Sequence, residues 1–289
     1  MLKYLFLIPV FNDWKSLNLL MQNIDKELSN FSRTGGVLVI NDNSTEKPEI
    51  NFNGLNNIKS IRLLNLNKNL GSQKSIAIGL KYLLKKNISC IITVMDSDGE
   101  DDPSKINEMI NIAENNEDKI VTSNRTSRKE NFLFKWLYVV HKFLTFIFST
   151  HWISFGNFSS FHSGNLSKIL RDNTTWLAFS SAISKNCKII RLYAMRKQRY
   201  FGKSKVNFLS LVLHSFRVIS VLQINVFFIS LFYSFLLFFL FFLDENIFYL
   251  FLISLIVILN FILFLVKSKN NIKELDLWES LIKNIKKII

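Results

Sequence analysis

Two aspartates spaced D-x-D directly after an apolar run are the strongest chemical signal in the chain. The run extends from Cys90 to Met95, and Asp96 and Asp98 follow it. A buried strand that ends in two acids carries a large desolvation cost unless a cation neutralises them. Mg²⁺ or Mn²⁺ holding a diphosphate would do so, because such ions take one or two carboxylates together with phosphate oxygens. The alternative interpretation is an acidic turn after a strand.

The elements around this motif predict where it lies. Strand-like runs at 4–8, 37–40, 58–66, 88–95 and 119–122 alternate with helix-like segments at 13–28, 71–86 and from 102 onward. This alternation predicts an α/β fold, with a mostly parallel sheet covered by helices on both faces. Ligands of such sheets bind outside the carboxyl ends of the strands. We therefore expect residues 9–13, 41–44 and 96–100 to converge on one crevice.

Composition limits the partners. The chain has 289 residues and a formal net charge of +14, and residues 131–243 hold thirteen Lys and Arg against one acid, Asp172. This balance predicts an anionic partner such as a nucleotide or a phospholipid surface. We do not expect nucleic acid as a partner, because the Lys and Arg residues cluster beside apolar segments and no nucleic-acid recognition motif is present. The two cysteines, Cys90 and Cys187, form no disulfide framework, which fits a reducing compartment. The apolar start is interpreted as a first strand and not as a signal peptide, because Pro9 interrupts it.

Two unbroken apolar runs predict a membrane hairpin. Residues 226–243 and 247–266 give 18 and 20 residues, separated by three polar residues. At about 1.5 Å per residue, each run nearly spans a hydrocarbon core of about 30 Å. Positive residues remain on the cytoplasmic side, and they flank the hairpin at Lys203, Lys205, Arg217, Lys267, Lys269 and Lys273. We therefore expect a multi-pass protein of the cytoplasmic (inner) membrane, with the large N-terminal part and the C-terminus in the cytoplasm.

Three further segments have an amphipathic pattern. Residues 132–153 and 208–222 are rich in aromatic and aliphatic side chains but interrupted by charge, which predicts helices lying in the membrane interface. A buried core helix is the alternative. The tail places Leu275, Trp278, Ile282, Ile285 and Ile289 at helical spacing, which predicts a third surface-lying helix. The expected domains are an α/β core at 1–130, a second part at 131–225, the hairpin at 226–266 and a basic amphipathic tail at 267–289.

Four motifs in order carry a family resemblance. Ile8-Pro-Val-Phe-Asn12, Ile40-Asn-Asp-Asn-Ser44, Asn69-Leu-Gly71 and Met95-Asp-Ser-Asp98 resemble inverting family-2 glycosyltransferases with the GT-A fold. The segment Arg199-Tyr-Phe-Gly-Lys-Ser-Lys205, followed by an amphipathic helix and a hairpin, is similar to the dolichyl- and undecaprenyl-phosphate sugar transferases. The resemblance implies transfer of a sugar from a nucleotide diphosphate sugar to a polyprenyl phosphate at the cytoplasmic membrane face, with Mg²⁺ or Mn²⁺ as cofactor.

The resemblance also implies residue roles. The metal ligands would be Asp96, Asp98 and Glu100, with Asp98 binding directly. The nucleotide sugar would contact Pro9, Phe11, Asn12, Asp42, Asp96 and Arg125. A basic loop made of Arg199, Lys203, Ser204 and Lys205 would grip the diphosphate or the acceptor phosphate, and Asp98, Asp96 and Arg199 would be the catalytic residues. Asp42 has the alternative role of a turn-forming residue, and Lys203 and Lys205 that of a patch for anionic lipid.

One departure from the family bears on the acceptor. Relatives that glycosylate hydroxyl groups carry an acidic base in the region where this chain has Asn157, and a hydroxyl must lose its proton during attack. A phosphate monoester is already largely a dianion at neutral pH, so it needs cations and no base. This predicts a phosphate acceptor. The alternatives are a hydroxyl of a lipid-linked saccharide or surface polysaccharide, and a catalytically inactive membrane scaffold. Self-association through the hairpin into a homo-oligomer is left open.

Overall fold

The computed structural model describes residues 2–125, 132–202 and 208–289. The chain forms two compact units: Met1–Lys129, Ser154–Lys205 and Lys273–Ile289 make the first, and Glu130–Ile153 with Val206–Ile272 makes the second. The predicted hairpin at 226–266 falls within the second unit, and the predicted parts 131–225 and 267–289 each contribute residues to both units.

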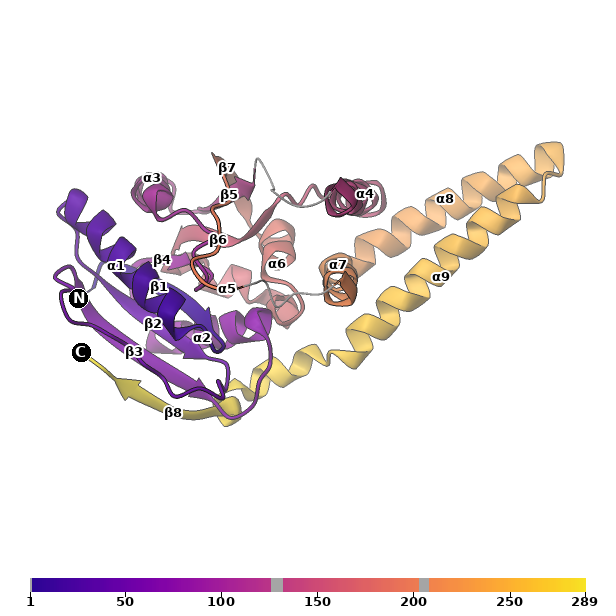
Figure 1. Ribbon diagram of the computed structural model, residues 1–289. Coiled ribbons are helices and arrows are strands. Elements are labelled where there is room, and N and C mark those ends of the chain that lie inside the picture. The colour runs from indigo at the N-terminus through magenta and orange to yellow at the C-terminus, as the bar shows by residue number, and fades with distance from the viewer. Residues whose placement is uncertain (1, 126–131, 203–207) are drawn as a thin grey trace. The chain divides into compact units, whose positions relative to one another are not determined.

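An eight-stranded sheet organises the first unit, in the order β7-β5-β6-β4-β1-β2-β3-β8 (Figure 1). Its strands are β1 (Tyr4–Val10), β2 (Gly35–Asn41), β3 (Ile58–Leu66), β4 (Ile91–Val94), β5 (Lys119–Arg125), β6 (Phe155–His162), β7 (Lys188–Ala194) and β8 (Ile282–Lys287). The strands β3, β2, β1 and β4 run parallel as neighbours, and β5 runs parallel to β7. The predicted α/β fold class is therefore confirmed.

The sheet is more mixed than the sequence indicated. Strand β6 runs antiparallel to both β4 and β5, and β8 runs antiparallel to β3. Strand β6 (FGNFSSFH) was not predicted because its Ser, Asn and Gly residues give little β-propensity. Pro9 was expected to end the first strand, but β1 continues to Val10, with Pro9 paired to Ile40. Because Pro cannot donate to a ladder, its place is near the end of the strand.

Helices cover the sheet on both faces. They are α1 (Trp14–Asn30), α2 (Ser72–Lys86), η1 (Pro103–Lys105), α3 (Ile106–Glu114), η2 (Ser163–Asn165), α5 (Leu166–Ile169), η3 (Arg171–Trp176), α6 (Phe179–Asn186) and η4 (Ile272–Leu281). Helix α1 packs with α3, and α2 packs with α5 and α6. Phe6 and Ile8 of β1 belong to the core beneath α1. On the opposite face, a Cβ added to Gly79 of α2 would lie 2.7 Å from Leu7 of β1, so α2 approaches the sheet closely.

The expected surface helix at the C-terminus is wrong. The tail instead forms η4 and then β8, which pairs with the outer edge of β3. Helical spacing of the apolar residues was misleading, because an unpaired sheet edge offers a row of hydrogen-bonding groups that a strand satisfies. Trp278 packs edge-on against Tyr82 of α2, and Asn284 accepts a hydrogen bond of 2.7 Å from Asn65 of β3.

Asp25 on α1 fixes the entry to β3, and this gives a stability prediction. Its carboxylate accepts backbone hydrogen bonds from Asn56 (3.2 Å), Asn57 (2.6 Å) and Ile58 (2.8 Å). Burial alone would raise the pKa of Asp25, but these hydrogen bonds outweigh it and hold the pKa below its ordinary value. The stabilisation is therefore present above about pH 4 and is lost as the pH falls through the lowered pKa of the folded state.

We expect Asp25→Ala to lower the free energy of unfolding by about 1–3 kcal/mol, because it leaves the buried N–H of Ile58 and the half-buried N–H of Asn57 without an acceptor. Thermal unfolding between pH 3 and pH 7 measures this. The gap between wild type and variant should shrink toward pH 3. A gap that is constant across this range would contradict the role of the ionised carboxylate.

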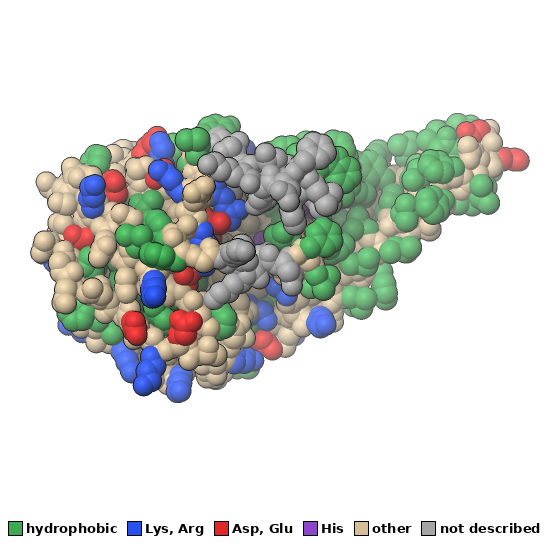
Figure 2. Space-filling model, viewed as in Figure 1, with side chains coloured by type: hydrophobic (Ala, Val, Ile, Leu, Met, Phe, Trp, Pro, Cys, Tyr) green, Lys and Arg blue, Asp and Glu red, His purple; other side chains and the backbone are tan. Residues whose placement is uncertain are grey.

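The second unit contains α4 (Phe132–Ser149), α7 (Phe208–Val221), α8 (Gln223–Asp244) and α9 (Phe248–Lys269). Two of its helices are long and apolar enough to cross a membrane: α8 and the helix that starts at Phe248. Only 11% and 6% of their most apolar stretches are buried inside the protein, unlike the core helix of a soluble domain. Apolar side chains cover the surface along α8 and α9 in Figure 2. The predicted hairpin is present as two antiparallel helices.

Candidate active site

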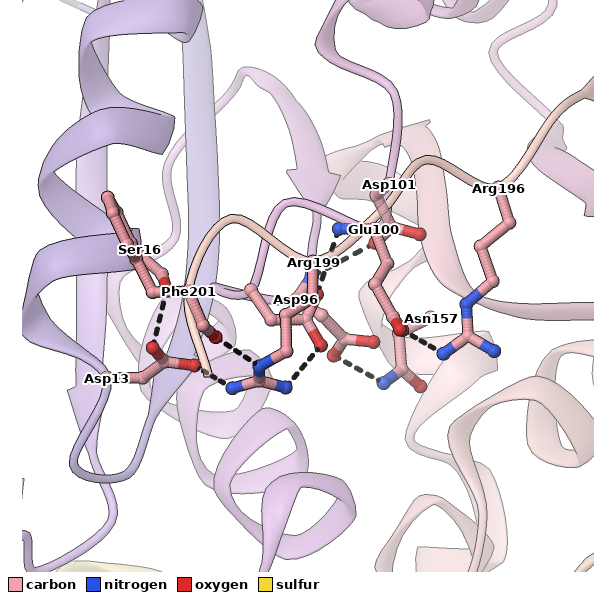
Figure 3. Close-up of polar contacts among 10 residues, drawn as sticks. Asp13, Ser16, Asp96, Glu100, Asp101, Asn157, Arg196, Arg199 and Phe201 are labelled. Carbon is pink, nitrogen blue, oxygen red and sulfur yellow. Dashed lines mark hydrogen bonds and ion pairs between the residues drawn. The ribbon is translucent and has the colours of Figure 1, made fainter. Parts of the chain in front are cut away.

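The acidic segment after β4 forms a tight turn. Gly99 takes a φ of +82°, a conformation that favours glycine. Within the turn, the Asp98 carboxylate accepts the backbone N–H of Glu100 at 3.1 Å, and the Asp101 carboxylate accepts that of Asp96 at 3.1 Å. These bonds hold the carboxylates at the carboxyl end of β4, where the sequence placed them (Figure 3).

A basic strap, residues 195–202, lies against this turn. The backbone N–H of Lys197 donates to the Glu100 carbonyl at 2.9 Å, and that of Tyr200 donates to the Asp98 carbonyl at 2.9 Å. The Tyr200 hydroxyl accepts a hydrogen bond of 2.8 Å from Asn23 on α1. The strap is therefore anchored at both the acidic turn and α1.

The strap presents two arginines to the acids (Figure 3). Arg199 pairs with Asp98 at 3.1 Å and also with Asp13, the residue before α1. Arg196 pairs with Glu100. Burial lowers the pKa of Arg196, and the nearby carboxylates of Asp98 and Asp96 oppose that shift. The arginines thus lie within the field of the D-x-D pair, as groups that bind phosphate beside a cation should.

Asn157 on β6 completes the surroundings of the first aspartate. Its side-chain amide donates to the Asp96 carboxylate at 2.8 Å, and Asn157 is 8% exposed. Asn157 was noted in the sequence because its amide cannot act as a general base. The structure places it in direct contact with the D-x-D motif.

The predicted metal ligands only partly fit a metal site. Asp96, Asp98 and Glu100 point to different partners, namely Asn157, Arg199 and Arg196. In the described part of the chain, no three His, Cys, Asp or Glu side chains are grouped as metal ligands. The D-x-D pair nevertheless suits a hard cation that takes one or two carboxylates and completes its shell with phosphate oxygens. A ligand role for Glu100 remains a prediction.

The predicted nucleotide side is held by the loops after β1 and β2. The backbone N–H of Asn12 donates to Ser44 Oγ at 3.0 Å, and the Asn12 amide donates to Thr45 Oγ1 at 2.8 Å. Phe11 is 37% exposed and Pro9 is buried. The structure thus brings two of the three predicted segments into contact.

Asp42 has a structural role. Its two carboxylate oxygens accept the backbone N–H groups of Leu70 and Gly71, both at 2.7 Å, and thereby fix the turn before α2. Burial raises the pKa of Asp42, and these hydrogen bonds oppose that shift. The alternative interpretation of Asp42 as a turn-forming residue therefore has structural support, and its contact with a nucleotide remains a prediction.

Three residues of the site were missed from the sequence: Asp13, Asp101 and Arg196. Asp13 falls in the predicted segment 9–13, but no role in the site was predicted for its side chain, which precedes α1 without capping it. Arg196 lies three residues before Arg199 in the same basic run, so spacing was the available signal. Of the predicted residues, Lys203, Ser204 and Lys205 and the side chain of Arg125 lie outside the described part of the structure.

The contact between Gly99 and Tyr200 gives a prediction. A Cβ at Gly99 would lie 2.4 Å from the Tyr200 ring, whereas at Gly54, with a similar φ of +81°, a Cβ meets nothing within 4 Å. Alanine at either position costs about 1–2 kcal/mol for the left-handed backbone. We expect only Gly99→Ala to displace the strap, and with it to lower catalytic activity at least about tenfold. Equal kcat/KM values in the two purified variants would contradict the role of the strap.

Comparisons with known proteins identify the family of the chain. A sequence model of glycosyl transferase family 2 matches residues 6–185. The chain therefore belongs to glycosyl transferase family 2, and the predicted family is confirmed. The protein is a glycosyltransferase whose catalytic unit has the GT-A fold.

Solved structures show the same fold at low identity. Glucosyl-3-phosphoglycerate synthase from Mycobacterium tuberculosis, in complex with Mn²⁺, UDP and phosphoglyceric acid, has a TM-score of 0.54 and 11% identity, covering 78% of each chain. Mannosyl-3-phosphoglycerate synthase from Rubrobacter xylanophilus has a TM-score of 0.51 and 10% identity, covering 76% of this chain and 72% of that one.

A third structure, S. aureus TarS 1-349, has a TM-score of 0.42 and 14% identity, and covers 77% of this chain. The chain spans 65% of that structure's length. No curated protein sequence matches the chain.

Proposed function

We propose that this glycosyltransferase moves a sugar, with inversion, from a nucleotide diphosphate sugar to a polyprenyl phosphate at the cytoplasmic face of a membrane. The acceptor phosphate oxygen attacks the anomeric carbon, the new C–O bond forms as the bond to the diphosphate breaks, and the nucleoside diphosphate leaves. In the transition state, the anomeric carbon has oxocarbenium character. One observation carries the acceptor assignment: Asn157 holds its amide against Asp96 at 2.8 Å.

Charge around the acidic turn supports a diphosphate donor with a cation. Among the residues that the structure describes, this region holds an excess of three negative charges: the acids are Asp13, Asp96, Asp98, Glu100, Asp101 and Asp102, and the bases are Arg196, Lys197 and Arg199. Asp98 and Asp96 would hold Mg²⁺ or Mn²⁺. When bound, the ion supplies Lewis-acid stabilisation of the charge that grows on the departing diphosphate. The Mycobacterium tuberculosis structure, with Mn²⁺ and UDP, supports the same pairing of cation and nucleotide here.

Arg199 would stabilise the same negative charge from the protein side. Its guanidinium already lies between Asp98 and Asp13, at 19% side-chain exposure. When phosphate oxygens enter, a planar fork of N–H donors can exchange a carboxylate for them. Arg199 would then orient the leaving diphosphate or the incoming phosphate. In this proposal, Phe11 and Arg125 would also contact the nucleotide sugar. Lys203, Ser204 and Lys205 would bind phosphate.

The choice between a phosphate and a hydroxyl acceptor depends on whether the acceptor must lose a proton. A hydroxyl acceptor requires a base that removes a proton, whereas the phosphate of a lipid monoester brings an oxygen that is already charged. Asn157 stands beside the D-x-D pair, and an amide takes no proton at neutral pH. Asp172, the one acid of residues 131–243, pairs with Lys185 at 54% side-chain exposure. Both facts favour an acceptor that needs no base.

The second unit supports a lipid-borne acceptor. Most large apolar side chains of α8 and α9 are exposed, and a bilayer is the solvent that makes such exposure stable. On α4, Lys142 lies over the rings of Tyr138 and Trp152, at 4.7 and 5.2 Å. Aromatic rings beside lysine are typical of a helix at the membrane interface. Lysines at the end of α9 favour the cytoplasmic orientation.

Comparison of two acceptors tests this function. Purified enzyme in detergent receives labelled nucleotide sugars with either a synthetic polyprenyl phosphate or a lipid-linked saccharide that offers only hydroxyl groups. We expect label on the polyprenyl phosphate alone, in a glycosyl phosphodiester that mild acid cleaves. Label only on the saccharide, in an acid-stable linkage, would overturn the acceptor assignment.

A further inference from the structure

A chain of side-chain amides leads from the start of α6 to the D-x-D motif. Gln73 lies in the first turn of α2, and its Oε1 accepts the backbone N–H of Phe179 at 2.7 Å. Its Nε2 donates to Asn157 Oδ1 at 3.0 Å, and Asn157 Nδ2 donates to Asp96 Oδ1 at 2.8 Å. Four elements far apart in sequence meet through these three bonds.

The direction of this chain is fixed at its far end. The backbone N–H of Phe179 can only donate, so the oxygen of the Gln73 amide must face it. The NH₂ group of Gln73 then faces Asn157, which must turn its own oxygen toward Gln73 and its NH₂ toward Asp96. A flip of either amide would place two donors or two acceptors against each other. The orientation of the Asn157 amide, which contacts Asp96, is therefore set by the hydrogen bond between Phe179 and Gln73.

Gln73 also serves α6 itself. Phe179 is the first residue of α6 and is fully buried, and the preceding Ala178 has no side chain that could cap the helix. An unpaired N–H there would be costly. A purely structural role as the cap of α6 is thus the competing explanation for Gln73, and a test must separate the two.

We propose that Gln73 is a positioning residue for the D-x-D carboxylate Asp96 and acts through Asn157. This inference rests on the proposed function, in which Asp96 holds a divalent cation. Residues that orient a metal ligand by hydrogen bonding affect metal affinity by about 10- to 100-fold. In this assignment Gln73 contacts neither the nucleotide sugar nor the polyprenyl phosphate. It affects only the orientation of the Asp96 carboxylate.

The substitution Gln73→Glu separates the two roles. A carboxylate at position 73 still accepts the Phe179 N–H, so the cap of α6 is kept. Its second oxygen cannot donate, so we expect the Asn157 amide to flip, with its NH₂ toward position 73 and its oxygen toward Asp96. We expect Mn²⁺ binding to weaken about 10- to 100-fold, while the melting temperature stays within about 2 °C of wild type. Gln22→Glu, at an exposed glutamine of α1, is the control for the added charge.

Mn²⁺ binding to the purified full-length chain is measured by electron paramagnetic resonance, with Mn²⁺ alone and with Mn²⁺ plus UDP. A double-mutant cycle with Gln73→Met and Asn157→Ala completes the test. If Gln73 acts through Asn157, each single variant weakens Mn²⁺ binding, and Gln73→Met adds nothing in the Asn157→Ala background. Gln73→Glu in that background measures the effect of charge through space alone.

Three results would overturn the inference: wild-type Mn²⁺ affinity in Gln73→Glu, additive effects in the cycle, or no Mn²⁺ binding by the wild-type chain in either condition. If Gln73→Glu fails to fold, Asn157→Ala carries the test, and unchanged affinity in that variant overturns the inference. A wild-type chain that binds Mn²⁺ but transfers no sugar would refute the proposed function and leave this inference standing.

Discussion

Asp98→Ala is expected to abolish sugar transfer, with kcat/KM at least about a hundredfold below wild type. Asp98 carries the double task of receiving Arg199 at 3.1 Å and of fixing the turn through the Glu100 N–H at 3.1 Å. Its removal takes away one carboxylate of the proposed cation pair and leaves Arg199 with the Asp13 carboxylate and the Phe201 carbonyl. Labelled transfer by purified enzyme, at donor concentrations below and above KM, measures the loss.

Asp118→Ala is the matched control for Asp98→Ala. Asp118 pairs with Lys188 at 3.3 Å on the surface, so its loss should change activity by less than about twofold. Cells that carry Asp98→Ala should lack the glycan that the enzyme serves. An unaltered cellular glycan in that strain would favour the inactive scaffold over the enzyme.

Arg199→Ala is expected to lower kcat/KM by about 10²–10³-fold, the cost of removing one donor aimed at developing negative charge. The side chains of its two carboxylate partners, Asp13 and Asp98, are only 13% and 17% exposed. Loss of Arg199 therefore leaves two negative charges close together with little solvation by water. Arg199→Lys should recover only part of the activity, because a point charge cannot replace a planar fork.

Lys197→Ala separates this effect from a general loss of positive charge on the strap. Lys197 reaches Asp102 at 3.5 Å with a side chain that is 55% exposed, so we expect at most about a twofold change. Full activity in Arg199→Lys, or equal losses in Arg199→Ala and Lys197→Ala, would show that Arg199 acts only through bulk charge.

The sequence predicted the parts of the fold that rest on local patterns. The parallel strands β1 to β4 are apolar runs bounded by turn residues, and β3 matches its expected bounds of 58–66. Strand β6 could not be found this way, since Ser, Asn and Gly become strand only between two neighbours that supply hydrogen bonds. The tail shows the same limit, because β8 depends on the free edge of β3.

The site divides along the same line. The D-x-D motif was visible because its two acids are two residues apart at the end of an apolar run. The pairing of Arg199 with Asp13 joins residues 186 positions apart, and that of Arg196 with Glu100 joins residues 96 apart. The role of Gln73 is harder still, because a polar residue in the first turn of a helix carries no local signal. Only the fold brings it to Asn157.

The most direct test of the central claim is metal-dependent transfer of label into lipid. Membranes that contain the enzyme receive radiolabelled UDP-, GDP- and dTDP-sugars, with and without EDTA, and lipids are then extracted. We predict label in the lipid fraction from at least one donor, loss of that label with EDTA and its return when Mg²⁺ or Mn²⁺ is added. Transfer that is indifferent to EDTA, or no lipid label from any donor, would contradict a cation-assisted glycosyl transfer to a lipid at the D-x-D motif.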